Sequence, residues 1–86
     1  MIQTFAELKR ELTVGKKLQL VETNVPNHKY LNTVREVIKQ QTNGVKLEGG
    51  SWLDLGYMGA KANNFTFQEG GFTCDFGDTK LVYKIL

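Results

Sequence analysis

The sequence of 86 residues has one cysteine, one proline and one histidine, and this scarcity excludes several kinds of site. Cys74 has no second cysteine with which to form an internal disulfide or a cysteine-based zinc site. It lies between Phe72 and Phe76 on an apolar face, so we expect it to be buried. A chain without disulfides is typical of a reducing compartment, and we expect a cytoplasmic protein. We expect His28 to be an exposed loop residue, and we predict no metal and no cofactor.

An excess of one charge and long apolar runs are also missing. Eleven Lys and Arg against nine Asp and Glu give a net charge of +2, which is too small to require a nucleic acid or an acidic membrane as partner. No apolar run approaches the roughly 20 residues that cross a bilayer, and no basic segment precedes one at the N-terminus. We therefore expect neither membrane insertion nor export. The uniform composition, 41% hydrophobic, predicts a single domain over residues 1–86.

The residue patterns of enzymes are absent as well. Acid–base chemistry needs two carboxylates brought together, but Asp54, Asp75 and Asp78 are scattered and fit strand or turn positions. Gly49-Gly50 and Gly70-Gly71 lack the strand–loop–helix setting and the following lysine of a phosphate-binding loop. We therefore predict that the protein is not an enzyme.

Glycine-containing turns are the clearest feature that is present. The segment Thr42-Asn43-Gly44-Val45 contains the dipeptide that best tolerates the two positive φ angles of a type I′ turn, and it predicts a β-hairpin. Further turns are predicted at Gly49-Gly50, Gly70-Gly71 and Gly77-Asp78, each between short runs of alternating apolar and polar residues. This rhythm is typical of a small antiparallel β fold.

One short helix is predicted before the first strand. Thr4 and Glu7 form a capping box, and Phe5, Leu8 and Leu12 then recur on one face. Gly15 is suited to a left-handed cap at the end of this helix. About two helical turns are unstable in isolation, so we expect the apolar stripe to dock on the end of a barrel.

The segments after this helix read mostly as strands. Residues 17–23 alternate, with Val21 shifting the pattern, whereas residues 31–42 fit either a helix or a strand. The Asn-Gly turn favours a strand that ends at Thr42. Trp52 is predicted on the face opposite Leu53 and Leu55. The core is predicted from the remaining alternating sets, which are Phe65 and Phe67; Phe72, Cys74 and Phe76; and Leu81, Tyr83 and Ile85.

These elements predict an α+β fold that is mainly β. We expect an N-terminal helix packed on a five- or six-stranded antiparallel barrel, SH3-like or of the oligonucleotide-binding (OB) type, because closure removes unpaired strand edges. The order of features, and above all Gly49-Gly50-Ser51-Trp52-Leu53, resembles small uncharacterised proteins of phages and integrative or conjugative elements of Gram-positive bacteria. That resemblance implies a cytoplasmic accessory protein and no particular activity.

A candidate binding surface remains after these exclusions. It combines aromatic residues, a methionine and lysines in or beside loops: Lys29, Tyr30, Trp52, Tyr57, Met58 and Lys61. Trp, Tyr and Met are enriched at the centres of protein interfaces, which favours an unknown protein partner. The same mixture suits single-stranded nucleic acid, because aromatic rings stack bases and lysines neutralise phosphates. Alternatively, Trp52 covers the barrel beneath the helix and packs on Phe5, Leu8 and Leu12.

Overall fold

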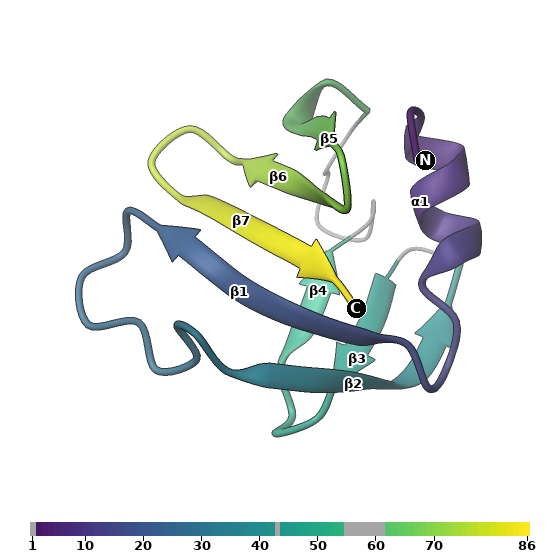
Figure 1. The fold of residues 1–86 in the computed structure, drawn as a ribbon, viewed down its shortest axis with the longest axis horizontal. Helices are drawn as coiled ribbons and strands as arrows, with labels where there is room; N and C mark the ends of the chain where they lie inside the picture. The colour runs from purple at the N-terminus through teal and green to yellow at the C-terminus, as the bar shows by residue number, and fades with distance from the viewer. Residues whose placement is uncertain (1, 43, 55–61) are drawn as a thin grey trace.

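The computed structural model describes residues 2–42, 44–54 and 62–86, which form one short helix and seven strands (Figure 1). The elements are α1 (Phe5–Glu11), β1 (Lys17–Thr23), β2 (Val34–Gln41), β3 (Gly44–Leu47), β4 (Trp52–Asp54), β5 (Phe65–Gln68), β6 (Gly71–Asp75) and β7 (Lys80–Ile85), with a 3-10 turn over Ala62–Asn64 before β5. In the part of the chain described here the predicted β-rich fold is confirmed, and so is the strand rather than helix interpretation of residues 31–42, although the strand covers only Val34–Gln41.

The strands form one antiparallel sheet in the order β4-β3-β2-β1-β7-β6-β5. Its two ends, β4 and β5, pair with no further strand in the described ranges, and the sheet is not closed into a barrel. The expectation of five or six strands is wrong, and the expected barrel is not confirmed. The prediction counted alternating runs, whereas closure depends on pairing between strands far apart in the sequence.

Strand β2 divides this sheet into two halves. Its first residues pair with β1 (Leu18 opposite Arg35), and its last residues pair with β3 (Gln40 opposite Val45). The register shifts between Val37 and Lys39, and a second shift lies between Leu20 and Glu22 in β1. Such irregularities increase local bending and twist. In Figure 1 the β3–β4 hairpin accordingly runs at a steep angle to β1 and β7 and passes behind them.

The core lies between these two halves and beneath α1. Its largest fully buried side chains are Phe72, Leu8, Leu12, Leu18, Leu20, Leu47, Val37, Val45 and Cys74. The inward positions predicted for β5, β6 and β7 are confirmed, because Phe65, Phe72, Cys74 and Tyr83 belong to this cluster while Phe67, Phe76, Leu81 and Ile85 pack against it.

Helix α1 begins where the capping box predicts. The Glu7 backbone N–H donates to Thr4 Oγ1 at 3.1 Å, and the Thr4 hydroxyl donates to the Glu7 carboxylate at 3.1 Å. Phe5 packs on Phe65 of β5, with 4.8 Å between ring centroids. The helix ends at Glu11, so Gly15 (φ +98°) is not its cap but lies in the following turn. No helix among the described residues is long and apolar enough to span a membrane.

The chain turns at Gly49-Gly50, at Gly70 and at Gly77-Asp78 as predicted, and Asn43 lies outside the described residues, but two of the predicted turn glycines belong to strands. Gly44 pairs with Gln41 and Gly71 with Gln68, and neither has a positive φ. The expected positive φ at Gly44 is therefore wrong. Space for a side chain is limited there for a different reason: a Cβ atom on Gly44 would lie 3.0 Å from the Leu53 carbonyl oxygen, and one on Gly71 would lie only 2.1 Å from that of Tyr83.

Candidate binding cleft

A cleft of about 450 Å³ opens between the two halves of the sheet. The loop between β1 and β2 contributes Val25, Asn27, His28, Lys29 and Tyr30. Strand β2 contributes Arg35, and the β3–β4 hairpin contributes Leu47, Ser51, Trp52 and Leu53. The far wall is formed by Phe76, Leu81 and Tyr83. Three of the six residues predicted for a binding surface, Lys29, Tyr30 and Trp52, therefore line one cleft.

The β1–β2 loop is held in place by hydrogen bonds at both ends. The Asn24 side chain accepts from the Lys80 backbone N–H at 2.9 Å, and the Asn32 N–H donates to the Leu20 carbonyl at 2.7 Å. His28 Nδ1 accepts from the Tyr30 N–H at 3.1 Å. His28 is half-buried, so the expectation of an exposed loop histidine is wrong. This bonding fixes the loop wall before any ligand arrives, which lowers the entropic cost of binding.

Arg35 lies within the cleft and is only 7% exposed. Its guanidinium carbon stacks 3.8 Å from the centroid of the Tyr30 ring, and Nη1 donates to Ser51 Oγ. Burial raises the pKa of Tyr83, and the positive charge of Arg35, together with a side-chain hydrogen bond from it, works in the opposite direction. The neighbours of Arg35 are thus a ring and two hydroxyl groups, all neutral near pH 7.

Trp52 forms part of the opposite wall and is 49% exposed. It does not belong to the buried cluster that includes Leu8 and Leu12, so the alternative of Trp52 as core beneath the helix is wrong. Lys46 Nζ lies 6.0 Å from the Trp52 ring, and Lys29 Nζ lies 5.4 Å from the Tyr30 ring. Both rings therefore carry a cation at their edge or face.

The charge of the cleft has one sign. Lys29 and Arg35 are in its lining, whereas no Asp or Glu is among the described residues that line it. The described residues contain one ion pair, between Lys16 and Glu11 at 3.7 Å. It lies beside α1, away from the cleft. Such a site favours an anionic or electron-rich ligand group.

Sequence reasoning missed Arg35, the most buried charged side chain of the described residues. The pattern that could have revealed it is the spacing of two residues between Arg35 and Val37, which places both side chains on the same face of a strand. Val37 is fully buried, so this is the inward face of β2. Tyr57, Met58 and Lys61 of the predicted surface, and Leu55, lie outside the described residues.

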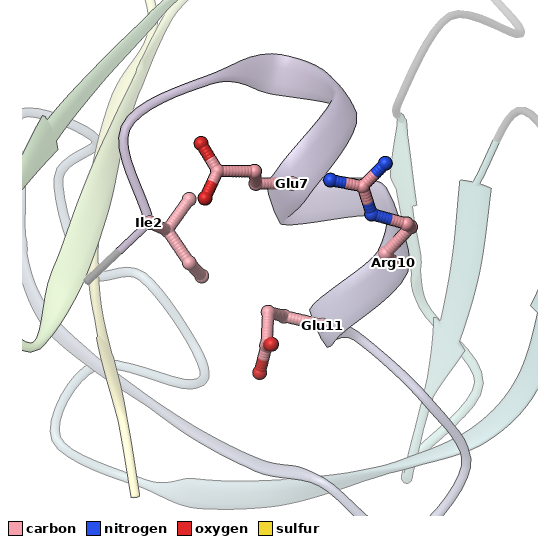
Figure 2. Close-up of a pocket in the computed structure, with 4 residues that line it drawn as sticks. All are labelled: Ile2, Glu7, Arg10 and Glu11. Carbon is pink, nitrogen blue, oxygen red and sulfur yellow. The ribbon is translucent and has the colours of Figure 1, made fainter.

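A second hollow, about 250 Å³ in volume, lies along α1 (Figure 2). It is lined by Ile2, Glu7, Arg10 and Glu11, and Figure 2 shows Ile2 between the Glu7 and Glu11 side chains. Both carboxylates already have partners, because Glu7 accepts from Thr4 and Glu11 pairs with Lys16. Because these two carboxylates are occupied by contacts within and beside α1, the cleft is the better candidate site.

Cys74 provides no reactive thiol for this site. It is fully buried in β6, as predicted, and burial raises its pKa to about 12. Since the thiolate is the nucleophilic form, this cysteine is inert near neutral pH.

Comparison with known proteins gives no relative for this arrangement: no family model, curated protein or solved structure matches the chain.

Proposed function

We propose that this protein is a non-catalytic binding module whose cleft holds a segment of a protein partner. The observation that carries the proposal is the position of Trp52, which stays half exposed in a domain of this size and faces a prearranged loop across a cleft. Large aromatic residues that line a preformed cleft are typical anchors of protein recognition.

The chemistry of the lining supports binding rather than catalysis. The Ser51 hydroxyl accepts from Arg35, and His28 Nδ1 accepts from a backbone N–H. Neither group is paired with the other as nucleophile and base, and no carboxylate is among the described lining residues. The setting in a phage or mobile element, the cytoplasmic location and the SH3-like or OB-like assignment remain part of this proposal.

Single-stranded nucleic acid is the second candidate, and the cations of the cleft favour it. Lys29, Lys46 and Arg35 would neutralise phosphates, and Trp52 would stack a base. However, Arg35 already covers one face of the Tyr30 ring at 3.8 Å. A base cannot stack on that face, so the site offers fewer stacking surfaces than its aromatic content suggests.

Selection from a phage-displayed library of random dodecapeptides tests the proposed function. Peptides should be recovered that bind the wild-type protein and change the fluorescence of Trp52, the one tryptophan of the chain. Measured by the fluorescence polarisation of a dye-labelled peptide, binding should be lost in Trp52→Ala and kept in Ile38→Ala, a matched control because Ile38 is 47% exposed on β2 and is not in the lining.

Two outcomes would contradict the proposal. One is a set of peptides that bind Trp52→Ala as well as the wild type. The other is recovery of no peptide together with quenching of Trp52 by a dT oligonucleotide at low salt that disappears at high salt, since steep salt dependence marks phosphate contacts.

A further inference from the structure

Arg35 is a buried charge with no opposite charge beside it in the described part of the chain. It is 7% exposed, and no Asp or Glu among the described residues forms an ion pair with it. Its contacts are the Tyr30 ring, the Ser51 hydroxyl and Tyr83. A buried cation normally requires a paired anion, because neutral hydrogen-bond partners replace only part of its lost hydration. The position of Arg35 in the cleft lining indicates that the missing anion arrives with the ligand.

The groups around Arg35 are suited to receive a carboxylate. A guanidinium presents several N–H donors in one plane, which matches the two oxygens of a carboxylate. Ser51 Oγ accepts from Arg35, so its own hydroxyl proton is available to donate into the cleft. Lys29 adds a second positive charge to the lining, and the described lining contains no carboxylate that would repel the incoming one.

The depth of Arg35 favours a side chain over a phosphodiester. Leu53, Phe76 and Leu81 make part of the lining apolar, and Arg35 is only 7% exposed, so a ligand anion must enter the cleft to reach it. A carboxylate on a flexible Asp or Glu arm can do so, whereas a backbone phosphate is held between two sugars at the surface of a groove. The apolar walls also suit the residues that flank an acidic side chain in a peptide.

We infer that the partner segment carries an Asp or Glu whose carboxylate is bound by Arg35, with Ser51 as a second donor. This inference rests on the proposed function, and it adds that the cleft selects acidic peptides. Arg35 would then be a specificity-determining residue that is kept buried and unpaired until the partner binds.

The dodecapeptides selected by display supply the test. Each acidic residue of a selected peptide is replaced by its amide, Asp→Asn or Glu→Gln, and binding is followed by Trp52 fluorescence. One such replacement should weaken binding at least about 30-fold, because it leaves a buried charge unpaired. Arg35→Lys, which keeps the charge but loses the planar fork, should weaken binding of the acidic peptide at least about 10-fold. The matched control is Arg10→Lys, since Arg10 is exposed on α1, and it should leave binding unchanged.

The outcomes separate this inference from the proposed function. Selected peptides that lack Asp and Glu, or that bind equally well as amides, would overturn the inference and leave a peptide-binding module. Failure to recover any peptide, with quenching by a dT oligonucleotide instead, would overturn both. The peptide replacements decide the question even if Arg35→Lys does not fold, because they leave the protein unchanged.

Discussion

Gly71→Ala tests how closely β6 and β7 approach each other. A Cβ atom at this position would lie 2.1 Å from the Tyr83 carbonyl oxygen and 3.2 Å from the Lys84 Cα. Contacts of a Cβ atom under 3.0 Å are essentially absent from real structures, so the two strands must separate locally by roughly 1 Å. Strand β7 cannot move freely, because it is also paired with β1 on its other side.

The expected cost follows from two opposing effects. Forcing a group into a packed site costs about 3 kcal/mol at the upper end of the usual range. Replacing glycine by alanine restricts the unfolded chain and returns up to about 1 kcal/mol. The free energy of unfolding should therefore fall by about 2 kcal/mol. For a domain of this size, that corresponds to a decrease in Tm of about 8–16 °C.

Urea denaturation and thermal melting, both followed by circular dichroism, measure this effect. Gly44→Ala is the comparison, because its Cβ would lie 3.0 Å from the Leu53 carbonyl oxygen and needs only a small adjustment. The gain from the unfolded state should nearly cancel that adjustment, so Gly44→Ala should be close to neutral. A Gly71→Ala protein as stable as Gly44→Ala would refute the close approach of β6 to β7.

Three further predictions concern the helix cap, the buried thiol and the buried guanidinium. Thr4→Ala should lower the free energy of unfolding, measured by urea titration, by about 1 kcal/mol, because it removes the acceptor of the Glu7 N–H. The control Thr13→Ala, at an exposed position, should change this free energy little. Burial raises the pKa of Cys74 from its ordinary value of 9.0 to about 12, so this thiol favours the folded state fully below pH 9 and loses that contribution as pH rises toward 12. About 1 kcal/mol should be gone by pH 10, and urea titrations at several pH values should show Cys74→Ala with a shallower decline over this range; equal slopes would contradict the burial of the thiol. Arg35→Met should lower the free energy of unfolding by no more than about 1 kcal/mol, since no Asp or Glu among the described residues is paired with Arg35, while it abolishes peptide binding; a loss of several kcal/mol, absent from Arg10→Met, would show that Arg35 is chiefly structural.

The local parts of the fold were predictable from the sequence. The strand over residues 17–23 and the capping box at Thr4 depend on neighbouring residues, and both are confirmed. For residues 31–42 a strand was chosen over a helix because a hairpin turn follows, and a strand is present there over Val34–Gln41. The register at the turn was not predictable to one residue: Gly44, the expected turn glycine, pairs with Gln41 as the first residue of β3.

The number and closure of the strands depend on contacts that no short window contains. In β2, Val34 and Ile38 fit the apolar spacing of a helix or of a strand, yet they are 46% and 47% exposed, while Val37 is fully buried. The register shift next to Ile38 interrupts the alternation and redirects the strand from β1 toward β3. A reading based on apolar spacing therefore places the wrong residues inward, and it also misses the bend that opens the cleft.

The candidate site was also only partly predictable from the sequence. Aromatic residues in loops suggest a binding surface by composition alone, so Tyr30 and Trp52 were found, and the cleft brings them together. Arg35 carries no such mark, because an arginine in a strand is ordinarily a solvated residue. Its burial follows from Val37, two residues along the same face, and from the pairing of Leu18 with Arg35 across β1 and β2. The side chain that we infer determines specificity is therefore visible only when strand register and burial are considered together.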